Sequence, residues 1–246
     1  MRQFGLIGYP LSHSFSKKYF TEKFETENLP GCSYDNYAIP SIAELPGILK
    51  DHPLLEGLNI TIPYKEQVIP FLSEASSVVK EIGACNCIKI NRGRLMGYNT
   101  DVTGFELSLK TNLAPHHTKA LILGSGGAAK AVEHVLRKLA VHYRYVSRNG
   151  LQGNLSYEQV TPALLNEFTL IINTTPLGMY PDVDSLPPIP YHAIGSSHYL
   201  FDLVYNPEKT LFLQKGQERG AVVKNGQDML VIQAEESWKI WNDPKQ

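Results

Sequence analysis

Apolar residues in the first hundred positions follow two periods, one typical of short strands and one typical of a helix. Four short runs have the composition and length of strands: 3–8, 34–39, 57–62 and 84–90. Between the first two runs, Tyr19, Phe20 and Phe24 fall on one face of a helix that starts near Ser16. Alternating strands and helices predict an α/β unit.

The second part of the chain continues this alternation. A helical pattern covers 101–110, and strand-like runs follow at 119–123, 143–147, 169–175, 199–205 and 221–223. This rhythm is typical of a parallel sheet with crossover connections, and the proline-rich segment 181–190 reads as a loop. The pattern of 227–241 predicts a final amphipathic helix. We therefore expect an α/β protein of two domains, 1–101 with the C-terminal helix 228–246, and 102–227.

Composition narrows the class of partner. The 246 residues are 43% hydrophobic, and 23 Lys plus Arg balance 24 Asp plus Glu, for a net charge of −1. This balance gives no basic footprint for nucleic acid or an acidic membrane, so we expect a small-molecule partner. Cys32, Cys85 and Cys87 lack a CxxC spacing and are expected to be free thiols. No signal-peptide or membrane-spanning run is found, which makes the cytoplasm the expected location.

The segment "GSGGAA" predicts a dinucleotide site. Gly124, Gly126 and Ala129 fit G-x-G-x-x-G/A, in which the glycines allow a tight turn and close approach of a pyrophosphate. A strand before and a long helix after place the phosphates at a helix N-terminus. A tight turn without a ligand is the alternative. The next strand ends at Arg148, where an NAD enzyme has an acid, so NADP is favoured, with NAD possible and a solvated arginine as the alternative.

A second candidate site begins in "NITIPYKE". Strand periodicity sends Leu58, Ile60 and Ile62 to one face and Asn59 and Thr61 to the other. If both faces are covered, each polar side chain needs a partner or costs about 1–3 kcal/mol. A polar ligand would supply partners, whereas a half-exposed strand in water would need none.

Other polar residues extend this candidate site. Ser12, Ser14 and Ser16 follow the first strand, at the end where open α/β sheets bind ligands, although a serine there can also cap a helix. Asn86 is another polar group on an expected buried face. Asp101 starts the next helix, where a plain N-terminal cap is the alternative.

Taken together, these segments resemble the shikimate dehydrogenases over almost the whole chain. The motifs occur in the family's order: "GYPLSHSFS", "NITIPYK", "GACNCI", "GYNTD", "GSGGAA", "INTTPLGM", "DLVYNP" and "NGQDMLVIQ". The resemblance implies an N-terminal α/β substrate-binding domain, a Rossmann-like NADP-binding domain, and a last helix that packs back on the first domain. It also implies the reversible, NADP-dependent reduction of 3-dehydroshikimate to shikimate in aromatic amino-acid biosynthesis.

The resemblance carries residue roles to matching positions. It implies that Lys65 acts as acid/base beside Asp101, and we treat the two as a coupled pair without assigning the base to either. Ser14 and Ser16 would bind the carboxylate of shikimate, and Asn59 would orient its neighbours. Four further side chains would contact hydroxyls or the ring: Thr61, Asn86, Tyr205 and Gln233. The expected coenzyme contacts are Gly124, Ser125, Gly126, Gly127, Ala128, Ser147, Arg148, Leu203 and Gly226.

Four questions stay open from the sequence. The segment between "VSRN" and "TLIIN" is shorter than is usual in the family and has Gln152 near the place of a second basic residue, so NAD could also be used. Quinate is an alternative substrate, and a non-catalytic NADP-binding module is the alternative of a different class. The protein could be a monomer or a homodimer.

Overall fold

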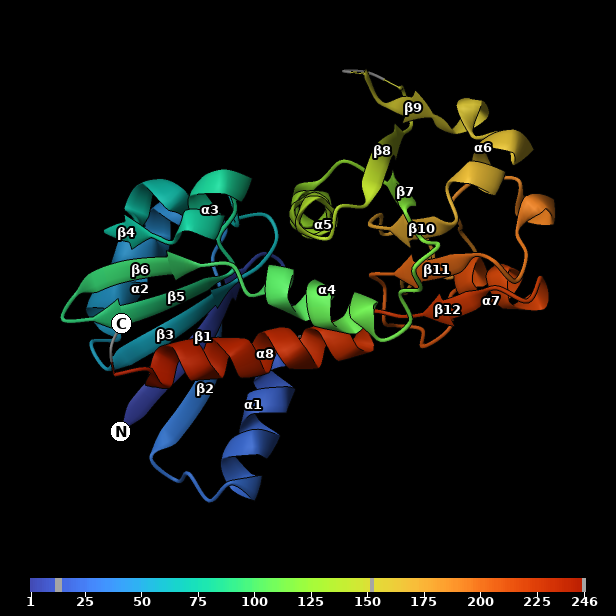
Figure 1. Ribbon diagram of the computed structural model, residues 1–246. Coiled ribbons are helices and arrows are strands. Elements are labelled where there is room, and N and C mark those ends of the chain that lie inside the picture. Colours follow the sequence, from blue (N-terminus) through green and yellow to red (C-terminus); the bar gives the residue numbers. More distant parts are fainter. Residues whose placement is uncertain (12–14, 151–152, 245–246) are drawn as a thin grey trace. The chain divides into compact units, whose positions relative to one another are not determined.

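A computed structural model describes residues 1–11, 15–150 and 153–244 and contains two six-stranded sheets (Figure 1). The chain divides into two compact units, residues 1–100 with 234–246 and residues 101–233. The predicted α/β class is therefore confirmed. In the last helix the division falls between Gln233 and Ala234, whereas the sequence placed it before residue 228.

The first unit is built on a mixed sheet with strand order β2-β1-β3-β5-β6-β4. Strand β1 pairs in parallel with β2 and β3, β5 is antiparallel to β3 and β6, and β4 is parallel to β6. The strands are β1 Arg2–Gly8, β2 Cys32–Ala38, β3 Leu55–Ile60, β4 Glu74–Ala75, β5 Cys87–Asn91 and β6 Arg94–Tyr98. The helices of this unit are α1 Phe15–Thr26, η1 Ile42–Glu44, α2 Leu45–Asp51, η2 Ile69–Phe71 and α3 Ser77–Ile82.

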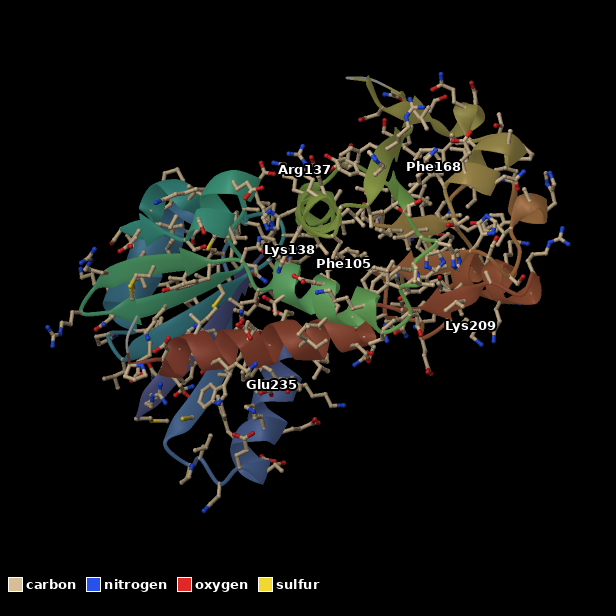
Figure 2. All side chains as sticks on the ribbon, in the orientation of Figure 1. Phe105, Arg137, Lys138, Phe168, Lys209 and Glu235 are labelled. Carbon is tan, nitrogen blue, oxygen red and sulfur yellow. The ribbon has the colours of Figure 1, made fainter. Side chains whose placement is uncertain are left out.

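The end of helix α8 (Gln227–Asn242) belongs to the core of this first unit. Trp241 stacks on Phe4 with ring centroids 4.9 Å apart, and its Nε1 donates to the carbonyl of Ile88 at 3.0 Å. Gly57 permits this packing, because a Cβ there would lie 2.4 Å from Trp241 Nε1. Glu235, labelled in Figure 2, accepts a hydrogen bond from the ammonium of Lys23 at 2.8 Å and so ties α8 to α1.

The second unit contains a fully parallel sheet with strand order β12-β11-β10-β7-β8-β9. The strands are β7 Lys119–Leu123, β8 His142–Ser147, β9 Leu155–Ser156, β10 Leu170–Asn173, β11 Tyr199–Asp202 and β12 Val222–Lys224. The helices are α4 Asp101–Lys110, α5 Gly127–Lys138, η4 Tyr157–Gln159, α6 Pro162–Glu167, η5 Tyr191–Ala193 and α7 Leu211–Glu218. Strands β7 and β10 read as continuous apolar runs because parallel strands in such a sheet are buried on both faces.

One burial prediction was wrong. Ile62 was expected to share the buried face of Leu58 and Ile60, but its side chain is 73% exposed. Strand β3 ends at Ile60, and the chain turns at once, with the amide of Tyr64 donating to the carbonyl of Thr61 at 2.9 Å. Pro63 has no N–H with which to continue a ladder, so the alternation of the strand no longer applies to Ile62.

Other predictions were confirmed. Cys32, Cys85 and Cys87 are free, and the last two are buried. The segment 181–190 is a loop, and the final helix begins at Gln227 as expected. None of the helices within the described ranges combines the length and the apolar composition needed to cross a bilayer.

Candidate functional site

The polar residues of the first unit gather at one edge of its sheet. Strands β1 and β3 are parallel, so their carboxyl ends lie side by side, and the amide of Thr61 donates to the carbonyl of Ile7 at 2.9 Å. A Cβ at Gly8 would come within 2.4 Å of Thr61 Cγ2. Glycine at this position therefore lets Thr61 lie against the end of β1, half-buried at the rim of the sheet.

Asn86 reaches the same edge from the antiparallel part of the sheet. It precedes β5, and Thr100 follows β6, whose last residue Tyr98 pairs with Cys87. The amide N–H of Thr100 donates to Asn86 Oδ1 at 2.6 Å, and Asn86 Nδ2 donates to Thr100 Oγ1 at 3.0 Å. Because a main-chain N–H can only donate, this pair fixes the orientation of the Asn86 carboxamide.

Asn59 is buried and satisfied by the protein itself. The residue is only 4% exposed, which excludes the alternative that this face of the strand is exposed to solvent. The hydroxyl of Tyr34 donates to Asn59 Oδ1 at 2.8 Å, while Asn59 Nδ2 donates to Ser237 Oγ at 3.0 Å and to the carbonyl of Asn86 at 3.3 Å. The geometry suits a residue that positions its neighbours.

Lys65 lies in the turn that follows β3 and is half-buried. Its carbonyl accepts a hydrogen bond from the amide of Cys85 at 2.7 Å. The preceding residue, Tyr64, is buried and donates its hydroxyl to the carbonyl of Ile39 at 2.6 Å. The backbone of this lysine is thus anchored on both sides independently of its ammonium group.

Two serines, Ser14 and Ser16, were predicted to bind the carboxylate of the substrate. Ser14 lies outside the described residues. Ser16 is half-buried in the first turn of α1. Burial raises the pKa of the Tyr34 hydroxyl, and a hydrogen bond with the Ser16 side chain lowers it in part.

Three of the predicted catalytic and substrate-binding residues belong to the second unit. Asp101 is half-buried and opens α4, and Tyr205 is half-buried just after β11, where burial raises the pKa of its hydroxyl. Gln233 is buried on α8, and its Nε2 donates to the carbonyl of Leu230 at 3.0 Å. Gly104 allows α4 to approach α8, since a Cβ there would lie 2.7 Å from the carbonyl oxygen of Met229.

The glycine-rich loop after β7 has the features of a phosphate cradle. Gly124 has φ of +103°, and a Cβ on it would lie 2.7 Å from Thr174 Oγ1 at the end of β10. Ser125 and Gly126 are exposed, and Gly126 caps α5 with no side chain over the free N–H groups of the first turn. Strand order reverses direction between β7 and β10, which is where dinucleotides bind in open parallel sheets.

The remaining predicted coenzyme residues lie at or just after the ends of three other strands of this unit, β8, β11 and β12. Ser147 ends β8, and the exposed Arg148 follows it. Gly226 is buried against Leu203, because a Cβ at Gly226 would come within 2.3 Å of the Leu203 carbonyl oxygen. Glycine is thus required where these two predicted contacts meet.

A buried carboxylate supports the strand ends beneath these loops. Asp202 accepts hydrogen bonds from Thr210 Oγ1 at 2.5 Å, from Asn173 Nδ2 at 3.0 Å and from the amide of Val204 at 3.0 Å. Burial raises the pKa of Asp202 from 3.8 to about 6, against the opposing effect of these hydrogen bonds. The sequence had placed Asp202 in a motif but had given it no role.

Asp202 should make stability depend on pH. Between about pH 4 and pH 6 the folded chain holds a proton that the unfolded chain releases, so the free energy of unfolding falls as pH rises through that window. We expect Asp202→Asn to remove this component, worth about 3 kcal/mol. Urea unfolding of both proteins across pH 4–7 measures it. If the free energy of unfolding changes with pH in the same way in both proteins, Asp202 is not the source of the pH dependence.

Sequence reasoning missed three residues that hold the predicted site together, Tyr34, Thr100 and Ser237. The signal for Ser237 was present, because it lies on the same helical stripe as the buried Ala234 and Trp241 and is itself fully buried. A hydroxyl on an apolar stripe needs a partner. The position of that partner depended on strands far away in sequence.

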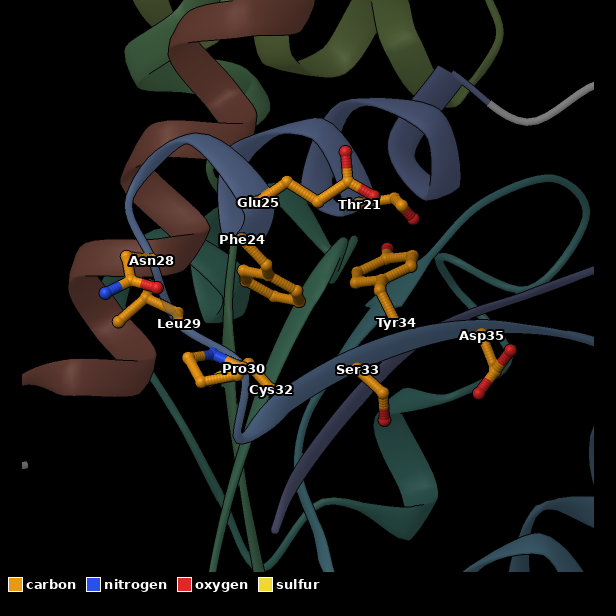
Figure 3. Close-up of a pocket in the computed structure, with 10 residues that line it drawn as sticks. All are labelled: Thr21, Phe24, Glu25, Asn28, Leu29, Pro30, Cys32, Ser33, Tyr34 and Asp35. Carbon is orange, nitrogen blue, oxygen red and sulfur yellow. The ribbon is translucent and has the colours of Figure 1, made fainter.

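A cavity of about 360 Å³ lies elsewhere in the first unit, between α1 and β2 (Figure 3). Phe24 and Leu29 line it together with the acidic Glu25 and Asp35. The ring of Tyr34 also faces this cavity, but no predicted substrate residue within the described ranges lines it. In the same ranges, no group of three or more His, Cys, Asp or Glu side chains could hold a metal ion.

Comparison with known proteins identifies the relationship. Residues 6–88 match the family model of the shikimate dehydrogenase substrate binding domain. The solved shikimate 5-dehydrogenase of Thermus thermophilus in complex with NADP(H) and shikimate is 31% identical, with a TM-score of 0.87 over 100% of this chain and 96% of that one. The Listeria monocytogenes enzyme in complex with shikimate and NAD is 25% identical, with a TM-score of 0.85 over 98% and 91%.

A relative named shikimate dehydrogenase (NADP(+)), from Carboxydothermus hydrogenoformans, extends the match to almost the whole sequence. It is 37% identical, and the alignment covers 96% of this chain and 90% of the relative. An alignment of this coverage extends over both units. The chain therefore belongs to the shikimate dehydrogenase family.

Proposed function

We propose that this protein is an NADP-dependent shikimate dehydrogenase, which reversibly reduces 3-dehydroshikimate to shikimate in aromatic amino-acid biosynthesis. The observation that carries the proposal is the 37% identity over 96% of the chain to a relative with that name. The open glycine loop of the parallel sheet and the polar edge of the mixed sheet support it, because they would supply the coenzyme site and the substrate site that the reaction requires.

The second unit fits NADP. Gly124 to Ala128 would hold the pyrophosphate at the N-terminus of α5, and the guanidinium of Arg148 would pair with the 2′-phosphate. Ser147, Leu203 and Gly226 would complete the contacts. When bound, the coenzyme supplies or accepts a hydride at C4 of its nicotinamide.

The substrate side is assigned to hydroxyl and amide groups. Ser14 and Ser16 would donate to the carboxylate, while Thr61, Tyr205 and Gln233 would contact hydroxyls or the ring. Asn86 is held with its Oδ1 toward the amide of Thr100, and an amide nitrogen carries two N–H groups. The second N–H of Nδ2 can therefore donate to a hydroxyl oxygen of the substrate.

Proton transfer is assigned to Lys65 and Asp101. In the direction of ketone reduction, Lys65 Nζ would give a proton to the oxygen on C3 as it becomes a hydroxyl. In the reverse direction the same oxygen must lose its proton to this pair. Because both groups would contact the same hydroxyl, we assign the proton transfer to the pair and not to either residue alone.

A spectrophotometric assay tests the proposal. Shikimate and quinate are each mixed with NADP⁺ and with NAD⁺, and the appearance of reduced nicotinamide is followed. We expect the highest kcat/KM for shikimate with NADP⁺. Absence of reduction in all four mixtures by a folded protein would reject the proposed enzyme activity, and a higher kcat/KM for quinate would reassign the substrate.

Arg148 should determine the preference for NADP. We expect Arg148→Gln to raise KM for NADP⁺ about 10–100-fold, since a charge-assisted hydrogen bond contributes about 1.5–3 kcal/mol. KM for NAD⁺ should change less than about twofold. Arg144→Gln, which removes another exposed arginine of the same segment, is the matched control. Equal effects on both coenzymes would place Arg148 outside the 2′-phosphate site.

A further inference from the structure

Five side chains of the first unit form one continuous chain of hydrogen bonds behind the predicted substrate residues. They come from β2, β3, α8 and the segments that flank β5 and β6. In order of contact they are Tyr34, Asn59, Ser237, Thr100 and Asn86. One end of this chain, Asn86, is a residue proposed to bind the substrate.

The direction of these hydrogen bonds is determined along most of the chain. The carbonyl of Asn86, which can only accept, lies 3.3 Å from Asn59 Nδ2 and fixes this carboxamide, with Oδ1 toward the Tyr34 hydroxyl at 2.8 Å and Nδ2 toward Ser237 Oγ at 3.0 Å. At the other end, the amide of Thr100 holds Asn86 Oδ1 at 2.6 Å. Thus neither carboxamide can rotate by half a turn without placing two donors or two acceptors against each other.

Ser237 joins the two halves of this chain. Its hydroxyl lies 3.0 Å from Asn59 Nδ2 and 3.2 Å from Thr100 Oγ1, and the residue is 0% exposed. Water cannot replace a hydroxyl at such a position without a cavity. Removing this oxygen would leave an N–H of Asn59 without an acceptor and would separate Thr100 from Asn59.

We propose that Ser237 is a positioning residue for substrate binding: it fixes Asn59 and Thr100 and, through Thr100, the Asn86 carboxamide that meets the substrate. The inference deepens the proposed function and rests on it. Ser237 itself touches no reacting atom in this scheme. Its effect reaches the substrate only through the orientation of Asn86, which both Thr100 and Asn59 contact.

Steady-state kinetics of Ser237→Ala test the proposal. We expect KM for shikimate to rise about tenfold, equivalent to about 1.4 kcal/mol, with kcat changed less than about twofold and KM for NADP⁺ unchanged. Ser108→Ala is the matched control, because Ser108 is also fully buried but its hydroxyl has no hydrogen-bond partner within the described part of the chain. The control should leave both KM values unchanged.

A conservative variant and a double variant show whether Ser237 positions its neighbours or only fills space in the core. Ser237→Cys keeps a weak acceptor of similar size, so its KM for shikimate should lie between those of the unaltered protein and Ser237→Ala. Tyr34→Phe should also raise this KM. Because both side chains act through Asn59, Tyr34→Phe combined with Ser237→Ala should raise KM by less than the product of the two single effects.

Contrary results separate failure of this inference from failure of the proposed function. A lowered melting temperature with unchanged KM for shikimate in Ser237→Ala and Ser237→Cys would reduce Ser237 to a packing role and overturn the inference. Fully multiplicative effects in the double variant would do the same. If the unaltered protein oxidises no shikimate, the proposed function fails and this inference fails with it, whereas normal oxidation with an unaffected Ser237→Ala variant overturns the inference alone.

Discussion

Lys65→Ala is expected to lower kcat for shikimate oxidation by about 10²–10⁴-fold, the usual contribution of a group that transfers a proton in the transition state. The fold should remain intact, because the contacts that anchor this segment belong to the main chain of Lys65 and to Tyr64. The carbonyl of Lys65 accepts from the amide of Cys85, and the Tyr64 hydroxyl donates to Ile39. The measurement is kcat for shikimate at saturating NADP⁺.

Controls distinguish lost chemistry from lost structure in this variant. Lys80→Ala removes an exposed lysine of α3 in the same unit and should leave kcat unchanged. Lys65→Met retains much of the side-chain bulk without a proton to donate, and it should be as slow as Lys65→Ala. Near-normal turnover in either folded Lys65 variant would remove this residue from the mechanism.

The coenzyme-binding unit could largely be predicted from the sequence because its signals are local. The run 119–123, the glycines that follow and the helix after them are consecutive, and the structure places them as β7, the loop and α5. What the sequence did not provide was the reason for Gly226. That reason is the carbonyl of Leu203, which belongs to another loop of the same unit.

The substrate-binding edge was harder to predict because its contacts join distant segments. Alternation placed Asn59 on the face opposite Leu58 and Ile60 but left open whether that face is covered, and it extended two residues too far and buried Ile62. The partner of Asn59 on α8, Ser237, is 178 positions away in sequence. No periodicity can reveal that pairing, since it depends on the fold that brings α8 to the sheet. Two-residue strands such as β4 depend equally on a partner strand.

Asp101→Asn is expected to lower kcat by about 10²–10⁴-fold, with little loss of stability. Asp101 is the first residue of α4, and asparagine at a helix start is about as favourable as aspartate. The substitution therefore removes a charge and a hydrogen-bond acceptor from the proposed pair while it preserves the helix. Asp228→Asn is the matched control, because Asp228 occupies the first turn of α8 and pairs with Lys224.

The double variant decides whether Lys65 and Asp101 act as one unit. If the two share the proton of one hydroxyl, loss of either disables the transfer, and loss of the second adds little. Lys65→Ala combined with Asp101→Asn should then have a kcat within about tenfold of the slower single variant. Independent roles would instead multiply the two losses, and a kcat near that product would assign the residues to separate steps of the reaction.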